Sequence, residues 1–279
     1  MSSCDYNERF SSFQRLYGTA PAALIKNLHV CVVGLGGVGS WAVESLARSG
    51  VGRLTLIDYD VVREGNINRQ LNALGSTLHR KKFAVLAERV AEINPDCVCT
   101  TIDDFVTLRN LDDYLSKARG YDYLIDAIDR IRFKAAMIYY CKRNKIPIIT
   151  TGGAGGLTDP TQIKVADLSR TYNDPLASKV RGQLRKEYGY TANPKRYFGV
   201  ECVFSAQHPV YPKADGTVSP QKPGIHGISL DCRFGYGSAS FVTAAFGLVA
   251  VSRVINKTLQ KSLEKTGENA AAGKDNKII

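Results

Sequence analysis

The cysteines of this chain form no metal-binding pattern. Seven are spread over 279 residues and no CxxC pair occurs, since Cys97 and Cys99 are separated by a single residue. A structural zinc site of four cysteines commonly uses two such pairs, so the sequence argues against one. The odd number and irregular spacing also fit no disulfide framework, and they indicate reduced cysteines in a cytoplasmic protein.

Acidic residues are scarce relative to basic ones. The chain has 26 Asp and Glu against 37 Lys and Arg, which gives a formal net charge of +11. This surplus points to an anionic partner, with nucleic acid as the leading candidate; a merely soluble basic surface is the simpler alternative. The first residues, MSSCDYNERF, lack the apolar core of a signal peptide, so we expect a cytoplasmic location.

Charge is absent between Arg233 and Arg253, where the chain reads FGYGSASFVTAAFGLVAVS. A membrane span needs about 20 predominantly apolar residues, so this run has nearly the required length. Small and hydroxylic residues dilute it, however. Their density is typical of a helix packed in a protein core or at a dimer seam, and we expect no stable membrane insertion.

Short apolar runs alternate with helical patterns up to about Thr151. We expect strands near residues 27–33, 53–57, 98–102, 121–125 and 146–150, and helices after residue 39 and over 82–93 and 133–141. Such alternation is typical of a parallel sheet with helical crossovers. The predicted fold class is therefore α/β, a Rossmann-like, mainly parallel sheet with flanking helices.

The pattern changes in the second half of the chain. Between residues 170 and 222 basic residues outnumber acidic ones, and aromatic residues lie among them. We interpret this stretch as a basic insertion on a mixed C-terminal part of the sheet. The whole is predicted to be one domain over residues 1–257, followed by a flexible tail over 258–279 that is rich in Ala, Gly, Lys and Glu.

The segment Gly34-Leu-Gly-Gly-Val-Gly39 follows an expected strand and opens a helix, in the pattern GxGxxG. In this pattern Gly34 allows the tight turn, Gly36 lets the backbone approach a phosphate, and Gly39 lets helix and strand pack closely. Asp58 follows Gly39 by 19 residues, at the end of the next strand, where a carboxylate can accept hydrogen bonds from ribose. The sequence therefore predicts an adenine-nucleotide site that includes Gly34, Gly36, Gly37, Gly39 and Asp58.

The residues that follow favour ATP over NAD, although an NAD-dependent oxidoreductase remains an alternative. Arg69 stands in NINRQ, Lys82 opens the next helix, and Arg15 lies upstream. Three cations near one nucleotide suit three phosphates better than the two of a dinucleotide. Each cation alone also fits a solvated surface position.

Asp129, in LIDAIDR, comes just after an expected strand end, with Arg130 beside it. A carboxylate at this edge of the sheet suits Mg²⁺ held between protein and phosphates. An N-cap of the following helix would equally favour Asp at this position.

Several motifs carry a more specific resemblance. GLGGVGSW, LIDYDVVREGNINRQ, AEINP and LIDAIDR resemble the MoeB/ThiF/HesA family of ATP-dependent carboxylate-adenylating enzymes, relatives of the ubiquitin-activating enzyme. RLYG, INPDCVCTTIDDF, CKRNKIP, TTGGAGGLTDPTQI and LDCRFGYGSAS are similar to the tRNA threonylcarbamoyladenosine dehydratase branch of that family, up to about Lys257.

This resemblance implies roles for individual residues. Adenosine and the α-phosphate would lie on Gly36–Gly39 and Asp58, and the phosphates on Asn66, Arg69 and Gln70. Lys82 would stabilise the leaving pyrophosphate, Asp129 would hold Mg²⁺ with Arg130 beside it, and Arg15 would reach across a homodimer. Cys232 matches a cysteine for which a catalytic or sulfur-relay role has been considered; a buried, unreactive thiol is the simpler interpretation.

The resemblance implies ATP-dependent cyclisation of threonylcarbamoyladenosine in tRNA, by adenylation of the threonine carboxylate. The expected partners are the tRNA anticodon region and a second copy of the chain, and the expected cofactors are ATP and Mg²⁺. Use of a monovalent cation and docking of a sulfur-transfer protein are left open. The missing CxxC pairs make adenylation of a ubiquitin-like sulfur carrier the less favoured alternative.

Overall fold

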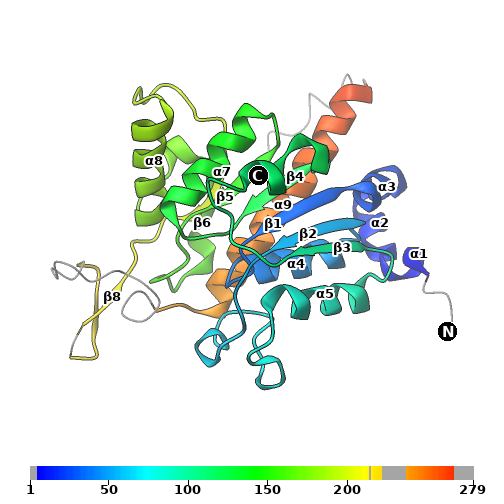
Figure 1. Ribbon diagram of the computed structural model, residues 1–279, viewed down its shortest axis with the longest axis horizontal. Helices are drawn as coiled ribbons and strands as arrows, with labels where there is room; N and C mark the ends of the chain where they lie inside the picture. Colours follow the sequence, from blue (N-terminus) through cyan, green and yellow to red (C-terminus); the bar gives the residue numbers. More distant parts are fainter. Residues whose placement is uncertain (1–4, 214, 222–236, 267–279) are drawn as a thin grey trace.

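The computed structural model describes residues 5–213, 215–221 and 237–266. Its centre is a seven-stranded sheet with the strand order β3-β2-β1-β4-β5-β7-β6 (Figure 1). The strands of this sheet are β1 (His29–Val33), β2 (Arg53–Ile57), β3 (Val98–Ile102), β4 (Tyr123–Asp126), β5 (Ile148–Thr151), β6 (Ile163–Asp167) and β7 (Glu201–Ser205). A separate short hairpin pairs β8 (Tyr211–Pro212) with β9 (Val218–Ser219).

Helices precede, connect and follow these strands. They are α1 (Tyr6–Arg9), α2 (Ser11–Tyr17), α3 (Thr19–Asn27), α4 (Gly39–Arg48), α5 (Lys82–Ile93), α6 (Leu111–Leu115), α7 (Ile131–Arg143), α8 (Pro175–Tyr188) and α9 (Ser240–Thr266). The first three lie at the amino ends of the strands, because α3 leads directly into β1 (Figure 1).

The strand order changes direction beside β1. Strands β2 and β3 lie on one side of β1 and β4, β5 and β7 on the other, and all of these neighbours are parallel. Only β6, at one edge, runs antiparallel to β7 among the strands of this sheet in the described part of the chain. In open α/β sheets ligands bind at the carboxyl ends of the strands where the order reverses, which here means β1 and β4.

Two apolar cores cover the two faces of the sheet. Along β1, Val30 and Val32 pack with α3, α4, α5 and α9, whereas Cys31 and Val33 pack with α6, α7 and α8. Because successive side chains of a strand point to opposite faces, a sheet buried on both faces reads as a continuous apolar run. This explains why HVCVV and YLID contain almost no polar residue.

The predicted α/β class, the parallel sheet and its mixed C-terminal part are confirmed. The expected elements over 53–57, 82–93 and 98–102 coincide with β2, α5 and β3. Helix α7 is longer at both ends than the predicted 133–141, and β4 begins two residues later than predicted, at Tyr123. The interpretation of 170–222 as an insertion needs correction, because β7 lies in the middle of this stretch and pairs with β5 inside the main sheet.

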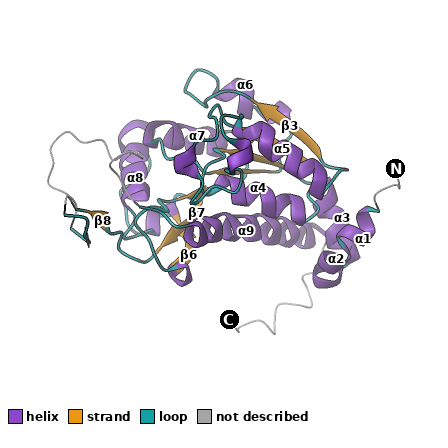
Figure 2. Cartoon of the chain, turned by 90° about the horizontal axis from the view of Figure 1, so that it is seen from below, coloured by secondary structure: helices purple, strands orange, loops and turns teal. Residues whose placement is uncertain are grey.

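Helix α9 corrects one further expectation. It continues to Thr266 and buries Leu259 in the core, so residues 258–266 are not the flexible tail that we expected. Its segment Ser240–Ser262 is long and apolar enough to cross a membrane by length and composition, and half of its most apolar window is buried inside the protein. Figure 2 shows α9 running from the β6–β7 part of the sheet toward α3. Its buried apolar residues, among them Phe246 and Val254, pack in the core of this domain, whereas Phe241 and Leu248 are exposed.

Candidate functional site

The glycine turn joins β1 to α4 at the reversal of the strand order. Gly34 has a φ angle of +89°, and a Cβ atom there would lie 2.9 Å from Ile128. A Cβ atom at Gly39 would lie 1.8 Å from the carbonyl oxygen of Gly34. Both positions therefore require glycine, one for its conformation and one for the close packing of helix on strand.

Asp58 directly follows β2 and holds the glycine turn through a hydrogen bond. Its carboxylate accepts hydrogen bonds from the backbone N–H of Leu35 at 2.6 Å and of Asp60 at 2.8 Å. Burial raises the pKa of Asp58, and Lys82 and the two N–H donors oppose this shift. Asp58 also lines the adjacent cavity, where a carboxylate can accept from a ribose hydroxyl.

Residues 60–70 and Lys82 form one wall of that cavity, the phosphate wall. The carbonyl oxygen of Arg69 accepts from Trp41 Nε1 and from Thr243 Oγ1, both at 3.2 Å, so α4 and α9 hold this residue in place. Its guanidinium donates to the Gly65 carbonyl at 2.6 Å. Gln70 lines the same wall, and its buried Oε1 has no hydrogen-bond partner among the described residues. Buried polar atoms need partners, and a ligand in the cavity could supply one.

Lys82 is buried at the start of α5, with 6% of its side chain exposed. Its ammonium lies 3.0 Å from a carboxylate oxygen of Asp60, and its backbone N–H donates to the Asp60 carbonyl at 3.1 Å. Both residues line the cavity. The cation is thus held at the site by an internal carboxylate.

Asp129 and Arg130 lie on the loop between β4 and α7, and both are exposed to the cavity. The N-cap of α7 is Arg130, without a side-chain capping bond. Asp129 does not cap the helix, and its carboxylate has no partner in the described part of the chain. It is therefore available to a ligand or a metal ion.

These segments surround a cavity of about 980 Å³ at the carboxyl ends of β1 and β4. Of the predicted nucleotide residues, it brings together Gly34, Gly36, Gly37, Asp58, Asn66, Arg69, Gln70, Lys82, Asp129 and Arg130. Gly39 lies behind them in the packing of α4. Within the described residues no group of three His, Cys, Asp or Glu could hold a metal ion by itself. A metal here would need ligands from water and a nucleotide, which is the usual coordination of Mg²⁺.

Two predicted residues are not part of this cavity. Arg15 is exposed on α2, at the amino ends of the strands, and donates to Ser12 Oγ at 2.8 Å. Within its own chain it therefore cannot reach the glycine turn. Cys232 lies outside the described residues.

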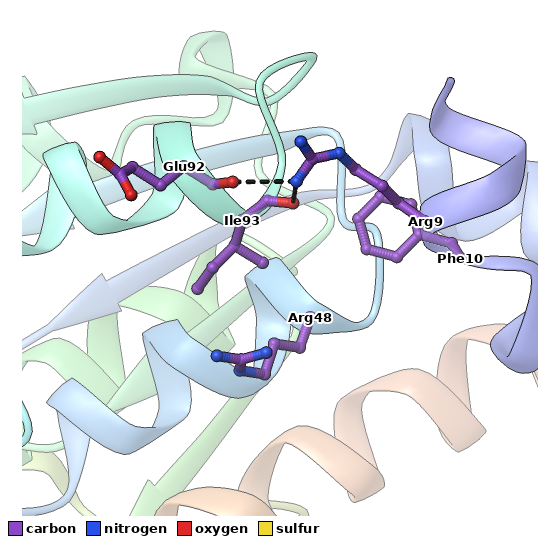
Figure 3. A pocket seen from close by; sticks show the side chains of 5 residues that line it. All are labelled: Arg9, Phe10, Arg48, Glu92 and Ile93. Carbon is purple, nitrogen blue, oxygen red and sulfur yellow. Dashed lines mark hydrogen bonds between the residues drawn. The ribbon is translucent and has the colours of Figure 1, made fainter. Parts of the chain in front are cut away.

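A smaller hollow of about 320 Å³ lies between α1, α4 and α5 (Figure 3). Arg9 reaches across it and donates to the carbonyl oxygens of Glu92 at 2.9 Å and Ile93 at 3.1 Å. An arginine that satisfies the last carbonyls of a helix has a structural role, so we attribute none of the chemistry to this hollow.

The cavity also contains charged residues that the sequence analysis missed. Arg63 and Asp60 belong to the phosphate wall, where Asp60 pairs with Lys82. Lys179 lines the cavity from α8. Arg63 lies inside the motif LIDYDVVREGNINRQ, which was a usable signal. Lys179 gave none, because it is one of many basic residues between 170 and 222.

Comparison with known proteins assigns the chain to a family. The model of the ThiF family matches residues 9–276. The chain belongs to the ThiF family. It is 51% identical over 257 residues to the tRNA threonylcarbamoyladenosine dehydratase of Haemophilus influenzae, covering 92% of this chain and 95% of that protein.

A solved structure extends the comparison to the whole fold of this ThiF-family protein. The crystal structure of Escherichia coli tRNA N6-threonylcarbamoyladenosine dehydratase in complex with ATP superposes with a TM-score of 0.84 and 47% identity, covering 95% of this chain and 99% of that one. The molybdopterin-synthase adenylyltransferase of Salmonella typhimurium is 33% identical over 128 residues, which is 45% of this chain and 49% of that protein. The similarity to the dehydratases thus spans about twice as much of the chain.

Proposed function

We propose that this protein dehydrates threonylcarbamoyladenosine in tRNA, using ATP to activate the threonine carboxylate. The observation that carries the proposal is the 51% identity to a curated dehydratase over 92% of the chain. The cavity supports it, because glycine turn, ribose carboxylate and cations meet at one edge of the sheet.

A free carboxylate is a poor electrophile, because its substitution would expel oxide. In the proposed first step one carboxylate oxygen attacks the α-phosphate of ATP, forming an acyl-adenylate and releasing pyrophosphate. Negative charge builds up on the leaving phosphates in this step. Cationic groups aimed at that charge lower the barrier.

The cations of the phosphate wall can stabilise this negative charge. Arg69 and Lys82 line the cavity from two different elements, and Arg63 adds a third cation. Asp129 would hold Mg²⁺ beside the phosphates, since its carboxylate lines the cavity without a partner among the described residues. When bound, the ion would neutralise phosphate charge. Arg69, Lys82 and Arg63 bind and orient the triphosphate.

In the second step a nucleophile of the same modified side chain attacks the activated carbonyl, AMP leaves, and a proton is released as the ring closes. The overall change is the loss of one water from the nucleoside, with ATP converted to AMP and pyrophosphate. Because both reacting groups belong to one molecule, correct positioning replaces a dedicated protein nucleophile. This mechanism does not require Cys232 as a nucleophile.

The test is mass spectrometry of tRNA nucleosides after incubation of modified tRNA with the protein and ATP. We expect a product lighter than threonylcarbamoyladenosine by one water, together with AMP and pyrophosphate. An unchanged nucleoside in the presence of bound ATP would refute the proposal.

We also propose that the active form is a cytoplasmic homodimer in which Arg15 acts on the site of the partner. Arg15 does not line the cavity of its own chain, so a second copy of the chain would have to bring it to the site.

Use of a monovalent cation stays a prediction, and we assign it to no residue that the structure describes. Adenylation of a sulfur-carrier protein is the second candidate function, favoured by the partial similarity to the molybdopterin-pathway enzyme. It would show as pyrophosphate release that depends on a protein C-terminus instead of tRNA.

A further inference from the structure

The cavity has a second wall that the nucleotide fingerprint does not explain. It consists of the loop over residues 151–157, the start of α8 and the residues after β7. The cavity, at about 980 Å³, is at the upper end of the 300–1,000 Å³ that small-molecule sites commonly enclose. It therefore has room for a second group opposite the phosphate wall.

A buried carboxylate holds this second wall together. Asp174, which is 6% exposed, accepts from the backbone N–H of Gly153 at 3.0 Å and caps α8 by accepting from Ala177 N–H at 2.8 Å. A Cβ atom at Gly152 would lie 1.7 Å from the same carboxylate. The loop is thus pressed against the start of α8 and has a fixed shape.

Lys179 extends from this rigid wall. Leu176, three residues earlier on α8, would contact a Cβ atom at Gly153 at 3.6 Å, so this face of α8 lies against the loop. Residues three apart share a helix face, and Lys179 accordingly lines the cavity. Its ammonium makes no ion pair and no hydrogen bond with any residue between 5 and 266 that the structure describes. Lys82, by contrast, is already paired with Asp60.

We propose that Lys179, on the wall held by Asp174, binds an anionic group of the tRNA-borne substrate and orients it toward the nucleotide on the opposite wall. This inference rests on the proposed function and assigns its substrate side. An ammonium ion on a preorganised wall suits a carboxylate or a phosphodiester oxygen equally well. The group is therefore either the threonine carboxylate or a phosphate next to the modified nucleotide.

The test compares Lys179→Met with Lys186→Met. Both changes remove one positive charge from α8, but Lys186 is 81% exposed and does not line the cavity. Binding is measured at one fixed salt concentration, since loss of any cation weakens RNA binding non-specifically. Each variant is titrated with tRNA carrying threonylcarbamoyladenosine and with the same tRNA carrying plain adenosine, in the presence of a non-hydrolysable ATP analogue.

We expect Lys179→Met to weaken binding of the modified tRNA about tenfold more than Lys186→Met does, the typical effect of losing one charged hydrogen bond. If that excess loss occurs only with modified tRNA, the bound group is the threonine carboxylate. If both tRNAs lose affinity equally, and by more than with Lys186→Met, the group is an RNA phosphate. Losses that match those of Lys186→Met for both tRNAs would overturn the proposal.

Two further measurements separate this inference from the proposed function. Pyrophosphate release by the wild-type protein on modified tRNA tests the function alone, and its absence refutes the function whatever Lys179 does. The affinity of the Lys179→Met variant for the ATP analogue tests whether its fold and its phosphate wall are intact. We expect this affinity to be unchanged. Lys179→Arg keeps the charge and should retain most of the tRNA affinity.

Discussion

The ammonium of Lys134 lies 3.0 Å from a carboxylate oxygen of Asp126, and both side chains are almost completely buried. Thr150 Oγ1 donates to the same carboxylate at 2.6 Å, and Lys134 also donates to the carbonyl oxygen of Ile128 at 2.9 Å. The pair therefore joins β4, β5 and α7 beneath the loop that carries Asp129. Through its bond to Ile128, Lys134 also anchors the start of that loop.

Replacing Lys134 with Met should destabilise the protein by about 3–5 kcal/mol, because it leaves a buried carboxylate without its partner. Urea unfolding at about pH 7 measures the loss. The double variant Asp126→Leu/Lys134→Met removes both charges and should recover most of the stability. A Lys134→Met variant as stable as the wild type would contradict this account.

The cost of Lys134→Met should also depend on pH. Burial raises the pKa of Asp126, and Lys134 opposes that shift. Without Lys134 the folded-state pKa rises further above the unfolded value, so the folded protein binds a proton more readily than the unfolded chain. Stability relative to wild type is then regained as the pH falls, and the deficit should be smaller near about pH 4 than near about pH 7. A deficit independent of pH would mean that Asp126 does not titrate.

Arg69→Ala should lower the rate of tRNA-dependent pyrophosphate release by about 10²–10³, because a donor to the developing phosphate charge is lost. Arg109→Ala is a matched control, since Arg109 is exposed and does not line the cavity. Turnover near the wild-type rate would remove Arg69 from the site.

Asp129→Asn should raise the Mg²⁺ concentration needed for half-maximal activity by about tenfold or more, because Mg²⁺ is held by one or two carboxylates together with phosphates. The melting temperature should hardly change, since Asp129 neither caps α7 nor makes an ion pair with any described residue. An unchanged metal requirement would show that Asp129 is not a ligand.

Neutralising Arg185, Lys195 and Arg196 together should weaken tRNA binding and flatten its salt dependence. Each lost phosphate contact reduces the slope of log affinity against log salt by about 0.7–0.9. These residues lie outside the cavity, so ATP binding should stay unchanged. A slope equal to that of the wild type would place the tRNA on another surface.

If Arg15 acts on the partner's site, mixing Arg15→Ala with Arg69→Ala should restore activity. Neither homodimer is active, but each mixed dimer has one site with both arginines. After unfolding and refolding of an equal mixture we expect about a quarter of the wild-type rate of pyrophosphate release. No gain over the separate variants would exclude action across a dimer.

Local patterns predicted much of the fold. The apolar strands, the glycine turn and the helix over 82–93 depend on neighbouring residues, and they appear where expected. The pairing of β7 with β5 could not be predicted, because it joins segments about 50 residues apart within a stretch of mixed polarity. The sequence analysis ended the domain at residue 257, because the Ala, Gly and Lys residues after residue 266 are typical of a tail. The helix continues to Thr266, and Leu259 anchors it in the core.

The candidate site was predictable to a similar extent. Gly34, Asp58 and Lys82 follow strand ends or open helices, so sequence position alone places them at one edge of the sheet. Arg15 could not be placed, since α2 precedes the first strand and no local pattern shows which end of the sheet it faces. Lys179 required the tertiary contact between α8 and the loop after β5.

The contact between Lys82 and Asp60 makes phosphate binding a competition for one cation. An ammonium has three N–H donors, so a phosphate can bind Lys82 beside the Asp60 carboxylate 3.0 Å away, and the repulsion between the two anions lowers its net affinity. The same repulsion favours the departure of pyrophosphate. The protein thus carries an internal competitor for its own product, and we expect this arrangement to hasten the clearing of the site for another round.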